Sequence, residues 1–198
     1  MTSIANQTDE QLGGEGSVFV RQRRDHERLA ALMERFRTSE RADQPAVLRE
    51  IDQLVFSHAF AEEVVLWPAI RRLVPGGGAL TARIEGEHQE INGLCAELER
   101  MQPTDPEWDA RIERAFQVMD EDVRDEEDMV LPALQEAADP ALWQRLGTAW
   151  EIVRRTAPTR PHPAVARRPP DNALRGIPLS VYDRTRDLLR RRAASRSA

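Results

Sequence analysis

The sequence predicts an all-α fold, an antiparallel up-down-up-down four-helix bundle followed by a C-terminal extension that contains one or two short helices. Three observations lead to this prediction. Aromatic residues are few (5%) and charged residues are plentiful (31%), which favours helices with one apolar face. Apolar residues recur at steps of three and four along four long segments. Short polar turns join these segments, so neighbouring helices should run antiparallel.

The first two helices have recognisable beginnings and ends. Ser17 can cap the first helix, because serine at this position accepts a hydrogen bond from a free backbone N–H. The second helix opens near Pro45, since proline is tolerated in a first turn. Pro75 and the three glycines at 76–78 then end this helix.

The third and fourth helices are separated by a turn at 103–106, which contains two prolines. Pro68 and Pro132 fall inside the second and fourth helical segments, where each should cause a kink or an end. A short helix near 140–154 and another near 179–191 complete the prediction.

These elements suggest three parts. We expect residues 1–16, which are polar and contain glycine, to form a flexible lead. Residues 17–138 should form the bundle, and the Arg- and Pro-rich residues 139–198 an extension that packs on it.

Charge and composition exclude several classes of protein. The net charge is −6, yet residues 154–198 carry twelve arginines against three aspartates. This basic tail lacks the interleaved aromatic residues of a single-strand-binding surface, so we expect it to dock on its own acidic body and not on nucleic acid. No apolar run approaches the roughly 18 residues that span a bilayer, so no membrane partner is expected.

The N-terminus and the single cysteine point to the cytoplasm. The first residues lack the basic start and apolar stretch of a secretory signal. Cys95 cannot form an internal disulfide, which fits a reducing compartment, and its position on an apolar face is typical of a small core residue.

Two segments of the chain resemble each other, and each contains a pair of polar residues four positions apart. One begins at His58 and includes Glu62, and the other begins at Asp122 and includes Glu126. In both, a second glutamate follows the first, and proline stands ten positions after the start. On a helix, residues four apart lie on one face with Cβ atoms roughly 5–6 Å apart. Each pair could therefore clamp a metal ion.

The preceding segments repeat as well. His26 stands 32 positions before His58, and His88 stands 34 positions before Asp122. One helical hairpin is thus used twice, an arrangement that could surround two metal ions.

Six ionisable side chains fall where the helical period requires apolar residues, namely His26, His58, Glu62, His88, Asp122 and Glu126. Burying them is costly unless a partner compensates their charge. One alternative is a buried network of hydrogen bonds between imidazoles and carboxylates, but the carboxylates would repel each other without a cation.

Imidazole with carboxylate suits iron, manganese or zinc. Glu62 and Glu126 could then bridge two ions. Two histidines, His26 and His58, would lie on one side, and His88 with Asp122 would lie on the other.

Neighbouring residues allow more than one interpretation. Glu63 and Glu127 should project about 100° away from the clamp glutamates, so they are either solvated or outer partners of the ligands. Asp25 and Glu87 precede two of the histidines and are either outer partners or surface charges. His162 lies in a Pro-flanked stretch and is predicted to be structural or exposed.

The pattern resembles the hemerythrin-like, HHE cation-binding family. The motifs that carry the resemblance read DHERL, HAFAEEVVLWP, EHQEI and DVRDEEDMVLP, and they cover roughly residues 17–138. The segments TRPHP and YDRTRDLL look like the C-terminal extension of actinobacterial members. The resemblance implies two iron ions in an oxo- or hydroxo-bridged, non-haem di-iron centre, with no organic cofactor. It also implies a small-molecule partner such as hydrogen peroxide, dioxygen or nitric oxide, in a monomer or homodimer.

Asp122 departs from the family pattern, which has histidine at this position. Aspartate is shorter, so it either leaves room for water or adds negative charge that favours the ferric state. Both outcomes argue against reversible oxygen carriage. We therefore predict catalase-like or peroxidase-like redox chemistry on peroxide or dioxygen. The alternative is a protein that binds or senses oxygen, nitric oxide or iron without turnover.

Overall fold

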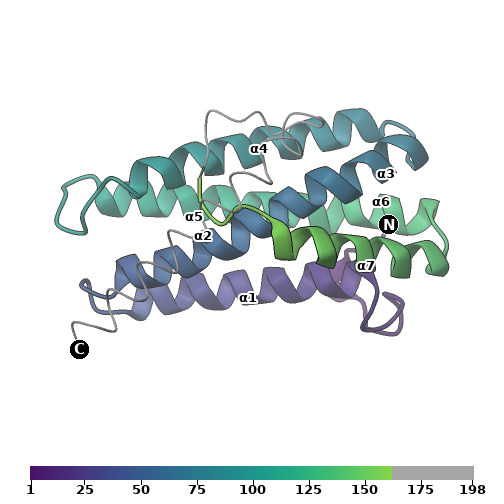
Figure 1. Ribbon diagram of the computed structural model, residues 1–198, viewed down its shortest axis with the longest axis horizontal. Coiled ribbons are helices and arrows are strands. Elements are labelled where there is room, and N and C mark those ends of the chain that lie inside the picture. The colour runs from purple at the N-terminus through teal and green to yellow at the C-terminus, as the bar shows by residue number, and fades with distance from the viewer. Residues whose placement is uncertain (162–198) are drawn as a thin grey trace.

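The protein is a bundle of antiparallel helices (Figure 1), seen in a computed structural model that describes residues 1–161. The four long helices are α1 (Val18–Thr38), α2 (Gln44–Ala61), α4 (Gly77–Leu98) and α5 (Trp108–Asp125). Two short helices continue them, α3 (Trp67–Leu73) after α2 and α6 (Leu131–Ala137) after α5. The short helix η1 (Ile4–Asn6) precedes α1, and α7 (Pro140–Thr156) follows α6. Residues 1–161 contain no strand, so the all-α bundle is confirmed.

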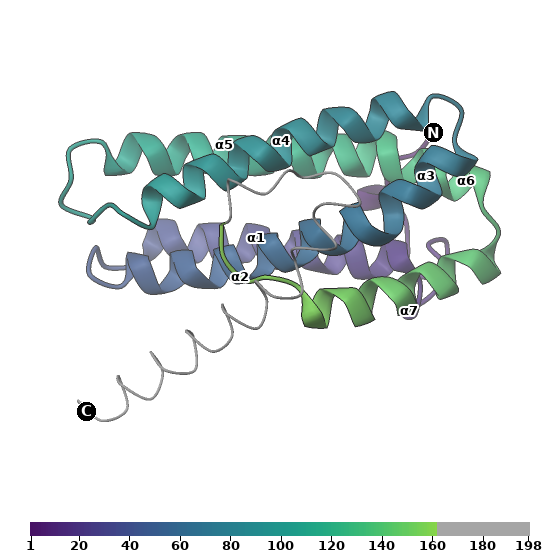
Figure 2. The same ribbon diagram turned by 45° about the horizontal axis from the view of Figure 1, so that its top comes forward.

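The turns alternate between the two ends of the bundle. Figure 2 shows the α1–α2 and α4–α5 connections at one end, and the α3–α4 and α6–α7 connections at the other. Ser17 caps α1 as predicted, since its hydroxyl accepts a hydrogen bond from the Phe19 N–H. Gly76 adopts a positive φ of 75° between α3 and α4, and a Cβ on Gly77 would lie 2.4 Å from the Ile70 carbonyl oxygen. These contacts explain why glycine ends this helix.

Two π-helical segments separate the long helices from their continuations. They are η2 (Glu62–Leu66) and η3 (Glu126–Val130), and each begins at a clamp glutamate. The N–H of Trp67 donates to the Glu62 carbonyl five residues earlier, and Leu131 does the same to Glu126. Proline follows directly in both cases and has no N–H to continue the α-helical pattern. The kinks expected at Pro68 and Pro132 thus take the form of a wider turn just before each proline.

The apolar core consists of two clusters. The first lies toward the α1–α2 turn and includes Leu32, Phe36, Leu48, Leu98, Trp108 and Phe116. The second lies toward the other end and includes Phe19, Leu66, Trp67, Ile84, Leu131 and Trp150. On all four long helical segments, the histidine and carboxylate residues fall between the part in the first cluster and the part in the second. A polar layer therefore crosses the middle of the core.

Residues 1–16 pack against the bundle instead of forming the expected flexible lead. Ile4 and Leu12 are fully buried in the second cluster. The Gln7 side chain donates a hydrogen bond to the Gln135 amide oxygen at 2.9 Å. These contacts close the bundle end that contains α3 and α6.

The extension begins with α7, which matches the short helix expected near 140–154. It packs across α1, α2 and η2 (Figure 1). His162 and the helix expected at 179–191 lie outside the described residues. Within residues 1–161, every helix is too short or too polar to cross a membrane.

Close packing of α7 predicts the effect of a single methyl group. A Cβ on Gly147 would lie 2.2 Å from the Gly16 carbonyl oxygen and 2.9 Å from the Val18 nitrogen. Gly147→Ala should therefore lower the free energy of unfolding by about 1–3 kcal/mol. Thermal unfolding should show a melting temperature lower by roughly 2–12 °C.

The matched control is Gly93→Ala in α4, where the added Cβ would have no atom within 4 Å apart from the neighbouring backbone of its own helix. It should be neutral or stabilising by up to about 1 kcal/mol, because alanine favours a helix interior. Equal melting temperatures for the two variants would contradict the packing described for α7.

Candidate metal centre

The six side chains singled out in the sequence meet in the polar layer. Each long helical segment contributes to the layer. His26 lies in α1 and His88 in α4. The clamp pairs lie where α2 passes into η2 (His58 and Glu62) and where α5 passes into η3 (Asp122 and Glu126). The clamp glutamates are the most deeply buried, since Glu62 is 0% and Glu126 1% exposed.

Five of the six form two groups whose ligand atoms lie within 4.8 Å of one another. One group is His26, His58 and Glu126, and the other is Glu62, His88 and Glu126. The Nε2 atoms of His26 and His58 are 3.3 Å apart, so both rings point toward one place. Each group offers imidazole and carboxylate together, and either could hold a metal ion.

The two clamp carboxylates extend from one group to the other. Glu126 Oε2 lies 3.1 Å from His26 Nε2, while its Oε1 lies 3.6 Å from His88 Nε2. Glu62 Oε1 lies 3.2 Å from His58 Nε2, and its Oε2 lies 3.6 Å from His88 Nε2. Each carboxylate thus turns one oxygen to each side, as a bridge between two ions would require.

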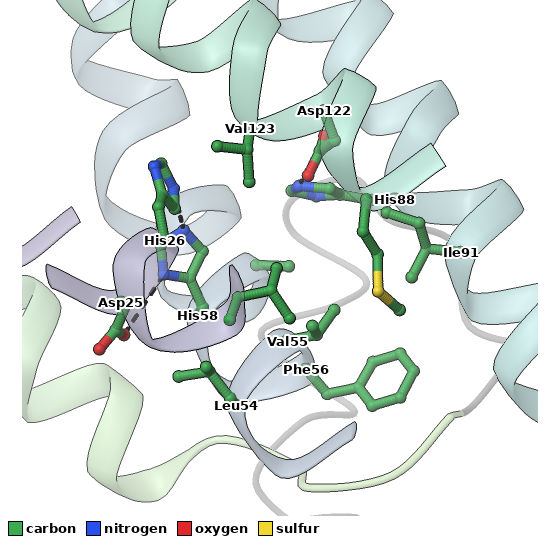
Figure 3. Close-up of a pocket in the computed structure, with 13 residues that line it drawn as sticks. Asp25, His26, Leu54, Val55, Phe56, His58, His88, Ile91, Asp122 and Val123 are labelled. Atoms are coloured by element: carbon green, nitrogen blue, oxygen red, sulfur yellow. Dashed lines mark hydrogen bonds and ion pairs between the residues drawn. The ribbon is translucent and has the colours of Figure 1, made fainter. Parts of the chain in front are cut away.

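Asp122 lies beside these groups without belonging to either. Its Oδ1 is 3.6 Å from His88 Nε2. Figure 3 shows Asp122 and His88 together on one side of a small pocket, with His26 and His58 on the other. The division into two sides follows the sequence prediction.

Each histidine contacts a carboxylate through its other ring nitrogen. His26 Nδ1 is 2.8 Å from Glu127 Oε1, and His88 Nδ1 is 3.0 Å from Glu63 Oε1. Donation of Nδ1–H to these oxygens presents Nε2 to the centre of the layer. Glu63 and Glu127 were expected to be either solvated or outer partners, and the structure places them as outer partners. The wider π-helical turn explains this, because it reduces the angle between successive side chains.

The third histidine is supported from another helix. His58 Nδ1 is 3.4 Å from Asp25 Oδ2 (Figure 3). The carboxylate that contacts this histidine of α2 therefore comes from α1. Glu87, the residue before His88, instead pairs with Arg83 at 3.3 Å. Of the two acidic residues that directly precede a histidine, only Asp25 reaches an imidazole in the described part of the chain.

Trp150 was missed in the sequence, because its helix lies outside the bundle and no local motif marks it. Its ring meets the His58 ring edge-on, with centroids 5.5 Å apart. Trp67, which follows η2, stacks on His88 with centroids 6.2 Å apart. These rings fix two of the imidazoles from the side of the second cluster.

The charges of the layer shift the pKa values of its members strongly. Burial alone lowers the pKa of His26, but the carboxylates of Glu126 and Glu127 outweigh it and raise that pKa to about 9. Burial and the negative charge of Glu126 both raise the pKa of Glu62. Burial also raises the pKa of Asp122 well above its ordinary value, although His88 opposes this. The layer therefore stabilises added positive charge, either as protons or as a cation.

The residues fit a transition metal. Both carboxylate oxygens of Glu62 and of Glu126 and the Oδ1 of Asp122 are buried and have no hydrogen-bond donor within residues 1–161. Such oxygens are costly to bury unless they bind something positive. Imidazole together with carboxylate is the donor set of iron, manganese or zinc, whereas calcium and magnesium prefer oxygen alone.

A small cavity adjoins the polar layer on the side of the first cluster (Figure 3). Its volume is about 20 Å³, close to the space that one water molecule needs. Apolar side chains form most of its walls, namely Leu29, Leu54, Val55, Ile91, Met119 and Val123. The cavity has room beside the polar layer for a molecule of about the size of water.

Comparison with protein families agrees with this geometry. The family model described as hemerythrin HHE cation binding domain matches residues 18–134, more than half of the chain. The chain belongs to the hemerythrin HHE cation-binding family. The matched hemerythrin domain runs from α1 into α6 and leaves α7 outside. The protein is therefore a metal-binding protein, and iron is the metal typical of this family. No curated protein and no solved structure matches the chain.

The overlap of the two groups predicts how metal content depends on each ligand. Glu126 belongs to both groups, so Glu126→Ala should remove most of the metal from both. His88 belongs to one, so His88→Ala should keep the ion at His26, His58 and Glu126. Iron per chain, measured by elemental analysis of protein purified without chelator, should be about halved in His88→Ala and close to zero in Glu126→Ala. Equal losses in the two variants would contradict a shared carboxylate.

Proposed function

We propose that the protein is a non-haem di-iron protein that decomposes hydrogen peroxide in a catalase-like cycle. The observation that carries this proposal is Asp122, which lines the small cavity beside His88 and whose buried Oδ1 forms no hydrogen bond within residues 1–161. Peroxide chemistry needs a group that moves protons next to the metal ligands. A histidine bound through its ring nitrogen could not offer a free oxygen there.

The catalase-like reaction requires two things of the protein, a bound pair of iron ions and a group that carries protons beside them. One molecule of peroxide is reduced to two molecules of water, and a second is oxidised to dioxygen and releases two protons. Two iron ions bound in the polar layer would supply and take back the two electrons. The two protons that the second peroxide releases equal the two that the first one consumes. Asp122 Oδ1 would carry one of them between the two halves, and the other would pass through solvent.

The cavity favours a small substrate at the layer. Its volume of about 20 Å³ suits a molecule such as peroxide. Most of its walls are apolar and include Leu29, Ile91 and Met119, so its polar groups are confined to the side of the metal ligands. The paired Nδ1 atoms of His26 and His88 keep both imidazoles in fixed orientations during the cycle.

A second candidate function is binding or sensing of dioxygen, nitric oxide or iron without turnover. The same small apolar cavity supports it, since diatomic gases favour apolar surroundings and have the right size. The two candidates differ in what they require of Asp122. Turnover needs its carboxylate to carry a proton, whereas binding alone does not.

Oxygen evolution from added peroxide distinguishes the two candidates. Iron-loaded wild-type protein should evolve dioxygen, and Asp122→Asn should do so about 10²–10⁴-fold more slowly, because an amide cannot carry the proton. Asp122→His should also turn over more slowly and hold dioxygen longer. Asp120→Asn is the matched control and should keep the wild-type rate, because Asp120 lies two residues before Asp122 on α5 and is exposed.

Iron content should be measured alongside, so that a loss of metal is not mistaken for a loss of proton transfer. If iron-loaded wild-type protein evolves no more dioxygen than free iron does, the catalase-like proposal is wrong and binding or sensing takes its place.

A further inference from the structure

The carboxylate that supports His58 has a partner of its own. Asp25 Oδ2, which is 3.4 Å from His58 Nδ1, also accepts a hydrogen bond from Arg154 NH1 at 3.3 Å. The same oxygen thus serves both an imidazole and a guanidinium. Only 13% of the Asp25 side chain and 25% of the Arg154 side chain are exposed, so solvent screens this pair only in part.

Several contacts hold Arg154 in position. Its guanidinium lies over the Trp150 ring, 5.2 Å from the ring centroid, and it pairs with Glu151 at 3.3 Å. Glu151 in turn pairs with Arg21 of α1 at 3.3 Å. The Trp150 ring itself packs edge-on against His58. Helix α7 therefore reaches His58 by two routes, through an aromatic ring and through a charged hydrogen bond.

We propose that Arg154 is a positioning residue that sets the reduction potential of the metal centre through Asp25 and His58. Arg154 lies in α7, outside the residues that match the hemerythrin domain. The extension would therefore adjust a reduction potential that the ligands on the four long helices otherwise determine. The proposal rests on iron binding at the polar layer, and it does not depend on peroxide turnover.

The physical argument concerns electron donation by His58. A carboxylate that accepts Nδ1–H makes an imidazole a stronger donor through Nε2. Arg154 draws negative charge toward itself and away from this hydrogen bond. His58 then donates less to a cation, which stabilises the ferrous state relative to the ferric state. The positive charge of the guanidinium acts in the same direction.

The distances agree with a weakened bond at His58. Its Nδ1 is 3.4 Å from Asp25, whereas the matching distances are 2.8 Å for His26 and 3.0 Å for His88. The group that contains His58 should therefore accept an electron more readily than the group that contains His88. Reduction of the iron pair would begin at His26, His58 and Glu126.

The test is the midpoint potential of iron-loaded, full-length protein, followed by its visible absorption during reduction. Arg154→Gln should lower the potential, with a tenfold change in the ratio of ferric to ferrous affinity equal to about 59 mV for one electron. Arg154→Lys keeps the charge and should restore part of the shift. Arg155→Gln is the matched control, because Arg155 is 75% exposed and pairs with the same Glu151, whereas within residues 1–161 it is Arg154 that contacts Asp25.

Asp25→Asn supplies a change of opposite sign, since a neutral amide supports the imidazole less and should raise the potential. A merely structural role for Arg154 would not give opposite signs in the two variants. Equal potentials for Arg154→Gln and Arg155→Gln, or shifts of the same sign for Arg154→Gln and Asp25→Asn, would overturn the proposal. An iron-loaded protein without catalase activity would overturn only the proposed function, since the potential would still be measurable.

Discussion

The cluster of carboxylates buried at the centre of the bundle is the constraint on which the rest of the structure depends. Glu62 and Glu126 lie in a layer between two apolar clusters, and their oxygens face imidazoles from three helices. Such a layer is unfavourable by itself, because buried carboxylates repel each other and lose their hydration. A cation bound between them reverses this, since it attracts every member of the layer. Metal binding and the stability of the fold are therefore linked.

The backbone is shaped to serve this layer. Each clamp glutamate begins a π-helical segment, and each segment ends just before a proline. The wider turn lets two successive glutamates face inward, the first toward the centre and the second toward the far nitrogen of a histidine. A regular α-helix would direct the second glutamate away from the layer. The proline thus acts on the site through the turn that precedes it.

The sequence was sufficient for the four long helices and for the residues that meet in the layer, because both follow from the 3.6-residue period and from the repeated spacing of the pairs. It was not sufficient for contacts between helices. The partner of His58 is Asp25, from a different helix, and local spacing carries no signal for that pairing. The N-terminal segment was expected to be a flexible lead because it is polar and contains glycine, yet its Ile4 and Leu12 complete a core that other helices build. Local sequence patterns identify the apolar and polar faces of each helix. Which residues of other helices contact those faces depends on the whole fold.

Thermal unfolding with and without metal tests the central claim most directly. The protein should be compared as iron-loaded and as chelator-treated samples at the same pH and ionic strength. A ligand present at about a hundred times its Kd stabilises the folded state by about 2.7 kcal/mol, which for a chain of this size raises the melting temperature by roughly 5–10 °C. The account predicts a rise of at least this order on iron loading. Equal melting temperatures for the two samples would contradict the claim that the buried carboxylates require a cation.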